Sequence, residues 1–312
     1  MHMFKKLGSL LAAGAVVLSL SACGGGSSQP ATSSAAGGGG KAIAMITVDI
    51  ANPYWKASAE TAQKVGKELG YSVTVDAHLN DPDKQSQYVD GAISKKVSAI
   101  ILDPAGAEES IGAVQKATDA GIPVFLVNAE ITAQGIAKSQ IVSNNAQGGT
   151  LGAEEWVKAV DYKGKYVELF GQPTDNNARV RSDAYKGVTS QYPELELVQT
   201  EVANWDRVEG KTKMETMLKA HPDIVGVISG NDEMALGAIE AIREAGKLDS
   251  IKVLGFDGNQ DAVDSVKKGE MVIVNAMTVT LSTDHRCVDG ALGAELLGAF
   301  KRYIENPMGM LV

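Results

Sequence analysis

The sequence predicts an α/β fold of two doubly wound parallel-sheet lobes joined by hinge crossings, and three observations support it. Short runs of β-branched residues recur, and most are separated by stretches with the apolar spacing of helices. The 312 residues exceed the usual length of one domain. The runs also form two series of about equal length. We therefore expect an N-terminal lobe over residues 41–143 plus 278–312 and a C-terminal lobe over residues 144–277, with crossings near 143–145 and 275–278.

Ten strands are expected, most of them followed by a helix. Pro53 occupies an early helical position, Gly70 follows the end of a helix, and Gly246 follows another. This alternation predicts right-handed crossovers between parallel strands that helices cover on both faces. In chain order the expected strands span residues 43–48, 72–75, 99–102, 124–127, 140–142, 166–170, 195–202, 224–228, 252–256 and 271–275.

The first 22 residues are interpreted as an export signal. Lys5 and Lys6 precede an apolar run over residues 7–22, which is shorter than the roughly 20 residues that a membrane helix needs. The run ends in Leu20-Ser21-Ala22-Cys23, which resembles the lipobox of bacterial lipoproteins. The resemblance implies that the bond before Cys23 is cleaved and that the Cys23 thiol receives a diacylglycerol. The alternative is that Cys23 is an incidental residue of a signal peptide that is cut nearby.

A flexible tether is expected after the lipidated cysteine. Residues 24–40 are almost entirely Gly, Ser, Ala and Thr, a composition that cannot form a core. With Cys23 lipidated, only Cys287 remains, so no intramolecular disulfide can form and Cys287 is interpreted as a small buried hydrophobe. We expect a protein of the cell envelope, held by lipid on the periplasmic or extracellular face of the membrane.

Composition and motifs exclude several classes of function. The net charge is −9, and no basic stripe with aromatic residues opposes it, so nucleic acid is not an expected partner. The first strand is not followed by Gly-x-Gly-x-x-Gly, and the glycine-rich residues 148–152 lack the lysine of a phosphate-binding loop. The four histidines show no metal spacing, and no Gly-x-Ser-x-Gly occurs. We expect no enzyme, no cofactor and no metal.

The candidate site follows from the fold. Ligands of open parallel sheets bind at the carboxyl ends of the strands. Asn, Asp, Arg and two of the three tryptophans gather there, and planar polar groups beside aromatic rings suit a polyhydroxylated ligand. The segments at these ends are residues 49–55, 103–104, 128–130, 144–145, 171–181, 204–206, 231–233 and 257–259.

Four motifs, collinear within residues 41–305, resemble the ribose-binding protein family. These are Asn52-Pro53-Tyr54-Trp55, Gly121-Ile122-Pro123-Val124, Asn231-Asp232-Glu233-Met234-Ala235-Leu236-Gly237-Ala238 and Gly255-Phe256-Asp257-Gly258. The family comprises the type I periplasmic binding proteins for sugars of ABC importers. The resemblance implies a substrate-binding lipoprotein that captures a neutral monosaccharide or sugar alcohol between two lobes and delivers it to a membrane permease. We expect a monomer.

The resemblance also implies ligand contacts. The candidate ligand-binding residues are Asn52, Tyr54, Trp55, Asp103, Asn128, Asn145, Arg181, Trp205, Asn231, Asp257 and Met277. Two departures argue against ribose itself. Asn128-Ala129 stands where the ribose binders carry Asp-Arg after the fourth strand, and Met277 stands where they carry a hinge glutamine. Each lost buried hydrogen-bonding group costs about 1–3 kcal/mol.

Simpler structural roles compete with these assignments. Asn52 and Asp206 can be helix caps, and Asp257 can be a turn residue before Gly258. Tyr54 and Trp55 can be packing aromatics, as Trp156 is expected to be. Arg179 and Arg181 cannot both face the site, so one is expected in solvent.

Two other functions are compatible with the same fold. One is a receptor that presents a sugar-like autoinducer or chemoattractant to a membrane sensor. The other is a ligand-responsive transcription factor, against which the lipobox and the lack of an N-terminal helix-turn-helix argue.

Overall fold

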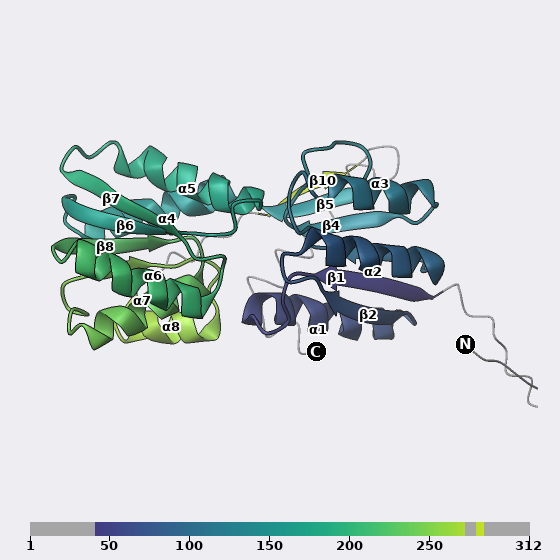
Figure 1. Cartoon of the computed structure of the whole chain (residues 1–312), viewed down its shortest axis with the longest axis horizontal. Helices are drawn as coiled ribbons and strands as arrows, with labels where there is room; N and C mark the ends of the chain where they lie inside the picture. Colours follow the sequence, from purple (N-terminus) through teal and green to yellow (C-terminus); the bar gives the residue numbers. More distant parts are fainter. Residues whose placement is uncertain (1–40, 272–278, 284–312) are drawn as a thin grey trace, which may run out of the picture. The chain divides into compact units, whose positions relative to one another are not determined.

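Two β-sheets organise residues 41–271 and 279–283, which the computed structural model describes (Figure 1). The first has the strand order β10 (Val279–Thr283), β5 (Ser139–Ser143), β4 (Val124–Asn128), β3 (Ala99–Leu102), β1 (Ala42–Thr47) and β2 (Ser72–Ala77). The second has the order β7 (Leu195–Val202), β6 (Gly164–Phe170), β8 (Ile224–Ser229) and β9 (Lys252–Leu254). In each sheet the chain's first strand lies between its second and third, so the winding reverses there. The predicted doubly wound α/β class is confirmed.

Helices connect the strands as the alternation predicts, and most begin at an Asn or Asp cap. Pro53 and Pro82 take the first helical position of their helices, where the missing N–H costs nothing. The helices are α1 (Pro53–Glu68), α2 (Pro82–Ser94), α3 (Ile111–Asp119), α4 (Asn145–Ala159), α5 (Asn176–Thr189), α6 (Arg207–Ala220), α7 (Asp232–Glu244) and α8 (Gln260–Lys267). Their N-termini follow strand ends, so the capping side chains gather at the edge of each sheet where ligands are expected.

The expectation of entirely parallel sheets is wrong at β10. This strand pairs antiparallel with β5, and Val279 lies opposite Ser143. The chain leaves the first sheet just after Ser143 and returns beside the point where it left, so the returning strand runs in the opposite direction. The strand expected at 271–275 is not observed at Met271, and residues 272–275 lie outside the described residues. The proposed lobe boundaries stay a prediction.

The second sheet is covered on both faces, as a parallel sheet requires. Successive strand residues point to opposite faces, and Val227 and Ile228 of β8 lie in two different hydrophobic clusters. Trp156 belongs to the second of these clusters and donates from Nε1 to the carbonyl oxygen of Lys252 (3.0 Å), so its expected packing role is confirmed. A Cβ at Gly226 would collide with the Trp156 ring, which explains a glycine inside this strand.

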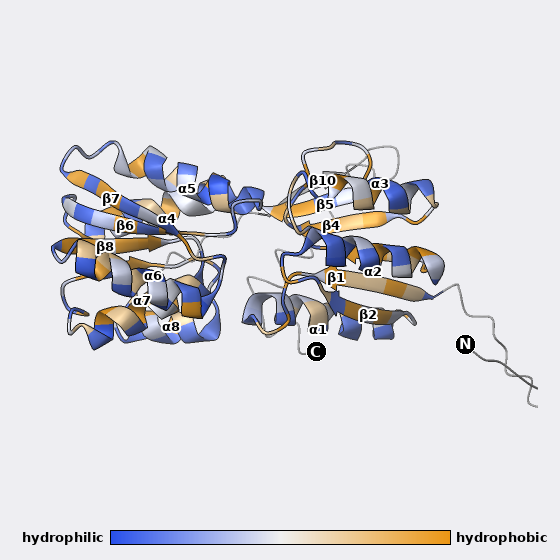
Figure 2. Ribbon diagram, viewed as in Figure 1, coloured by the Kyte–Doolittle hydropathy of each residue, from blue (hydrophilic) through white to orange (hydrophobic). Residues whose placement is uncertain are grey.

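The first sheet has its own core. Ile46, Ile100, Leu102 and Leu126 are fully buried and form one cluster with apolar residues of the flanking helices. Figure 2 shows β4 and β5 of the first sheet and β8 of the second as mainly hydrophobic, and hydrophobic and hydrophilic residues alternating along the helices. Among the described residues, no helix combines the length and the apolar character needed to cross a bilayer.

Candidate functional site

Several site residues lie at strand ends in an unusual backbone conformation. Asn128 is the last residue of β4 and has φ of 66°, Trp205 follows β7 with φ of 66°, and Asp257 follows β9 with φ of 114°. Residues with a Cβ rarely adopt positive φ, and such strain is found mostly at functional sites. The conformation turns these side chains out of the strand direction.

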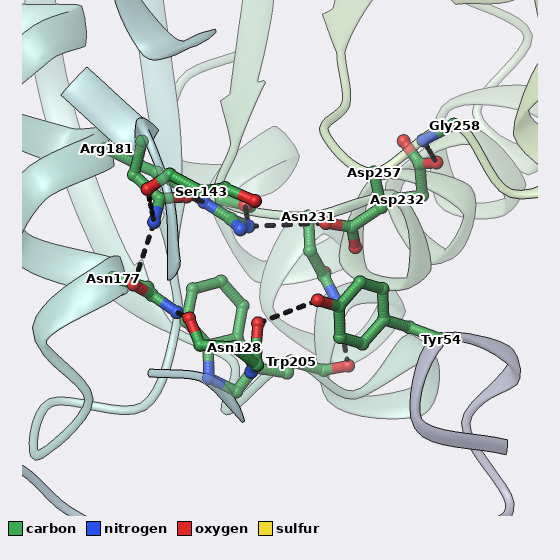
Figure 3. A network of polar contacts seen from close by, with 12 residues as sticks. Tyr54, Asn128, Ser143, Asn177, Arg181, Trp205, Asn231, Asp232, Asp257 and Gly258 are labelled. Carbon is green, nitrogen blue, oxygen red and sulfur yellow. Dashed lines mark hydrogen bonds and ion pairs between the residues drawn. The ribbon is translucent and has the colours of Figure 1, made fainter. Parts of the chain in front are cut away.

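In the first sheet, four predicted residues form one hydrogen-bonded group. The Trp55 indole donates from Nε1 to Asp103 Oδ2 (2.7 Å), and the Asn128 side chain donates from Nδ2 to the same oxygen (3.0 Å). The Tyr54 hydroxyl donates to Asn128 Oδ1 (2.9 Å), as Figure 3 shows. Tyr54 is 38% exposed, whereas Asp103 is 2% exposed. Burial raises the pKa of Asp103 well above its ordinary value. Asp103 therefore fixes the Trp55 indole and the Asn128 amide, and Asn128 in turn fixes the Tyr54 hydroxyl.

A buried histidine, His78, contacts the main chain of Asp103 in this group. His78 lies 2.8 Å from the Asp103 carbonyl oxygen through Nε2, and its Nδ1 accepts the N–H of Asn80 (3.2 Å). The two bonds together assign the proton to Nε2. Burial lowers the pKa of His78, so the ring is neutral. These two hydrogen bonds give His78 a structural role beside Asp103.

Beside the second sheet, Arg181 of α5 is the centre of the polar contacts. Its guanidinium donates from Nε to Asn145 Oδ1 (2.8 Å) and from Nη1 to the Gly230 carbonyl oxygen (2.8 Å). It lies flat against the Phe256 ring, 3.8 Å from the ring centroid. Arg181 Nη1 lies 3.5 Å from Asp257 Oδ1. The arginine is thus held rigidly, with the Asp257 carboxylate at its edge.

Close helix packing brings Arg181 to this position. Gly149 of α4 faces α5, and a Cβ there would lie 2.9 Å from the Ala184 Cβ and 3.3 Å from the Arg181 carbonyl oxygen. Gly152, one turn later, faces Leu254 of β9. The glycine-rich segment 148–152 therefore permits close packing, as expected. Arg179 is exposed and bonds Asn176 Oδ1, so it is the solvated member of the arginine pair.

A small cavity lies among the residues of these two groups. It is lined by Asn52, Tyr54, Trp55, Asn128, Asp175, Asn177, Arg181, Trp205, Asn231 and Asp257. Eight of these ten are predicted ligand residues. The predicted residues Asp103 and Asn145 do not line it but contact the residues that do. Met277 and Cys23 lie outside the described residues.

A second, larger cavity adjoins the first. Asn52, Trp55 and Trp205 line both cavities. The two tryptophans therefore separate the small cavity from the larger one. The indole of Trp205 is itself stacked near Arg181, whose guanidinium carbon lies 5.5 Å from the ring centroid.

Some of the competing structural roles are observed. Asn52 and Asn231 each cap a helix and also line the small cavity. Asn52 caps α1 by accepting the Tyr54 N–H (3.0 Å), and Asn231 caps α7 by accepting the Met234 N–H (3.0 Å). Asp206 caps α6 and does not line the small cavity. Asp257 precedes Gly258 in a turn, yet its carboxylate faces Arg181.

Sequence reasoning missed Asp175 and Asn177 as individual residues. Asp175 caps α5 by accepting the Asn177 N–H (2.8 Å), and its carboxylate accepts a hydrogen bond from Trp205. Burial raises the pKa of Asp175. Both residues lie in the segment 171–181 that was identified at a strand end. The signal was present for the segment, but the spacing did not show which side chains enter the cavity.

The electrostatics of the second sheet depend on two carboxylates. The Asp257 side chain is 13% exposed, although its backbone faces solvent. Burial raises the pKa of Asp257 to about 6, and Arg181 opposes the rise. Burial and the nearby Asp257 charge raise the pKa of Asp232 to about 7. Within the described part of the chain, no group of His, Cys, Asp and Glu could hold a metal ion.

Known proteins resemble this chain in sequence and in fold. Residues 43–282 match the family described as periplasmic binding protein domain. The chain is 50% identical over 229 residues, 73% of each protein, to the D-apiose import binding protein of Paraburkholderia graminis. It is 34% identical over 225 residues, 72% of each, to the ribose import binding protein of Bacillus subtilis. A solute-binding protein of Actinobacillus succinogenes, solved with bound D-allose, shares 29% identity and a TM-score of 0.69 over 74% of this chain and 83% of that one.

Proposed function

The chain belongs to the ribose-binding-like family of type I periplasmic sugar-binding proteins, and we propose that it captures a neutral monosaccharide or sugar alcohol for an ABC importer. Members of this family are solute-binding proteins and not enzymes, and they work outside the cytoplasm. The loaded protein would deliver its ligand to a membrane permease. The lobes over residues 41–143 plus 278–312 and 144–277 would close on the ligand, which selects the closed form by bridging both.

The observation that carries the proposal is the lining of the small cavity. Arg181 lies beside Asp257, and Asp175 accepts a hydrogen bond from Trp205, so the charged side chains of the lining already have partners, while Asn128, Asn177 and Asn231 contribute amides. A neutral ligand suits this lining, because a charged ligand would compete with these partners. Amides, carboxylate and guanidinium bind hydroxyl groups in pairs, and the Trp55 and Trp205 rings suit the C–H faces of a sugar.

The relatives indicate a single sugar unit as the ligand class. The relatives with similar sequences or folds bind single sugars, as their names state: D-apiose, ribose and D-allose. We propose D-apiose as the first candidate because that relative shares half of the aligned residues. Ribose is disfavoured by Asn128 and Met277, which replace the family's ribose-specific residues.

We propose attachment through a lipid on Cys23. The lipobox-like residues 20–23 and the Gly/Ser tether over residues 24–40 support it. A lipid anchor keeps a binding protein beside its permease, whereas a freely diffusing one is diluted.

A thermal-shift screen tests the proposal. The purified protein is heated with D-apiose, D-ribose, D-allose, sugar alcohols, a sugar phosphate and an amino acid. A ligand that binds only the folded state raises the melting temperature by mass action, so a neutral sugar or polyol is expected to give the largest rise. The proposal fails if the sugar phosphate or the amino acid stabilises the protein and no neutral sugar or polyol does.

A further inference from the structure

Asp232 is a fully buried carboxylate that does not line the small cavity. It is the first helical residue of α7, directly after the cap Asn231. Its Oδ2 accepts two backbone hydrogen bonds, from the N–H of Gly258 (2.7 Å) and from the N–H of Asn259 (2.8 Å). Figure 3 shows the first of these bonds behind Asp257. One carboxylate oxygen thus holds the two peptide groups that immediately follow Asp257.

These two bonds restrain an unfavourable backbone conformation. Asp257 has φ of 114°, a region that residues with a Cβ rarely adopt. Such a conformation persists only where the surroundings impose it. The Asp257 carboxylate faces Arg181 in this conformation, with Oδ1 3.5 Å from Nη1. Rotation of the backbone at Asp257 would turn the carboxylate away from the arginine.

The arrangement is unfavourable for Asp232 itself. Its Oδ1 receives no hydrogen bond from any residue that the structure describes. Asp232 and Asp257 also repel each other, which contributes to the raised pKa of Asp232. A Cβ at Gly255 would collide with Asp232 Oδ1, so the loop leaves space for this oxygen. An unpaired buried oxygen beside a like charge indicates a requirement other than stability.

Helix stabilisation alone does not explain Asp232. An acidic residue in the first turn favours a helix, but Glu233 already supplies that charge. Asn231 already caps the helix through Met234 N–H. Glu233 reaches this loop only through the Asn259 side-chain amide, whereas Asp232 accepts the main-chain N–H groups of Gly258 and Asn259.

We propose that Asp232 is a positioning residue, which holds the loop 257–259 so that the Asp257 carboxylate faces Arg181 and the ligand. This inference rests on the proposed sugar-binding function and deepens it. Asp232 acts on the ligand only through Asp257, so its removal lowers affinity where Asp257 is present and changes little where Asp257 can no longer contribute its charge.

A double-mutant cycle tests this dependence by calorimetry. D-apiose, D-ribose and D-allose serve as probes, and the sugar that the wild type binds most tightly is used throughout. Asp232→Ala is expected to weaken binding by about tenfold or more, as expected for a misplaced charged contact. In the Asp257→Asn background, the same substitution is expected to change affinity less than about twofold. Equal losses in both backgrounds, or no loss in either, overturn the proposal.

A ligand-free measurement separates this proposal from the sugar-binding one. Hydrogen exchange at the amides of Gly258 and Asn259 is expected to accelerate in Asp232→Ala and to stay slow in Asp232→Asn, which keeps an oxygen acceptor. Unchanged exchange in Asp232→Ala overturns the positioning role even if the wild type binds a sugar. If exchange accelerates in Asp232→Ala but the wild type binds no sugar, the role of Asp232 in holding the loop stands. Only the proposed sugar-binding function is then contradicted.

Matched variants complete the test. Asp261→Ala removes a neighbouring carboxylate that pairs with Arg207 and does not touch the two amides, so affinity and exchange are expected to match the wild type. Should Asp232→Ala fail to fold, Asp232→Ser takes its place, because its shorter side chain cannot hold both amides. Loss of affinity in Asp261→Ala equal to that in the Asp232 variants contradicts the proposal.

Discussion

The side chain of Asn177 donates from Nδ2 to the main-chain carbonyl oxygen of Asn128 at 3.1 Å, and this bond joins the two halves of the site. Asn177 Oδ1 accepts from Asn145 Nδ2 (2.8 Å), and Asn145 Oδ1 accepts from Arg181. A continuous chain of amides therefore runs from the arginine at the second sheet to Asn128 at the end of β4. Residues far apart in the sequence form one polar network around the cavity.

The first prediction concerns this bond. Asn177→Ala removes the hydrogen bond to the Asn128 carbonyl and leaves Asn145 Nδ2 with only the more distant Ser143 carbonyl oxygen as acceptor, which costs about 1–3 kcal/mol. Sugar affinity is expected to fall about five- to fiftyfold, measured by calorimetry. Gln191→Ala, at an exposed position just after α5, is the control and is expected to bind as the wild type does. Equal affinities of the two variants would remove Asn177 from the site.

Asp257→Ala is expected to nearly abolish binding while the protein stays folded. A carboxylate that accepts ligand hydroxyls forms charge-assisted bonds of roughly 1.5–3 kcal/mol each. Circular dichroism checks the fold, and calorimetry gives the affinity. Asp264→Ala, at an exposed carboxylate of α8, is the control. Affinity that is unchanged in Asp257→Ala would reduce Asp257 to a turn residue.

Acidification is expected to stabilise the ligand-free protein through Asp232 and Asp257. Burial raises the pKa of Asp232 to about 7 and that of Asp257 to about 6, so below these values the folded protein holds protons that the unfolded chain, with a pKa of about 3.9, releases. The free energy of unfolding contributed by the pair therefore falls as pH rises from about 4 to 7. His78, whose pKa is lowered by burial, acts in the opposite direction on acidification.

The pH effect is measured against a variant. Urea unfolding at pH 5 and pH 7 gives the slope for the wild type, and Asp232→Asn removes one of the titrating groups. The slope is expected to become less negative by up to about 1.4 kcal/mol per pH unit. Asp249→Asn, at an exposed position, is expected to leave the slope unchanged. A slope in Asp232→Asn identical to that of the wild type would show that Asp232 does not titrate in this range.

Lipid attachment is predicted at Cys23. Acyl chains bury CH₂ groups at about 0.8 kcal/mol each, and two chains hold a protein on a membrane where one is marginal. Wild-type protein is expected in the membrane fraction with the mass of a diacylglycerol, and Cys23→Ser is expected without it. Fractionation with mass spectrometry measures both. An unmodified, soluble wild type, or the same lipid mass on Cys23→Ser, contradicts the assignment.

Much of the fold could be predicted because strands covered on both faces are continuous apolar runs. Nine of the ten expected strands correspond to observed ones, from β1 to β9. The return strand β10 was not expected, because its antiparallel place beside β5 depends on where the chain re-enters the sheet. No local sequence pattern in residues 279–283 predicts β5 as the partner strand.

The candidate site could be predicted at the level of strand ends but not of single contacts. Topology places the carboxyl ends of the strands together and so predicts the segments that contain Asn128, Arg181 and Asp257, while the family resemblance implies these residues within the segments. The roles of Asn177 and Asp232 depend on side-chain directions, since each bonds a group that lies far away in the sequence. Asp103 and Asn145 were identified correctly as belonging to the strand ends, yet they contact the lining residues from behind.

The central claim is that the cavity between Tyr54, Arg181 and Asp257 takes one neutral sugar, and calorimetric titration tests it most directly. The wild type is titrated with D-apiose, the other monosaccharides and polyols of the screen, and in parallel with a sugar phosphate and an amino acid. The account predicts binding of one molecule of a neutral sugar or polyol per chain and no measurable binding of the charged compounds. Tight binding of the sugar phosphate or the amino acid, with no heat from any neutral sugar or polyol, would contradict it.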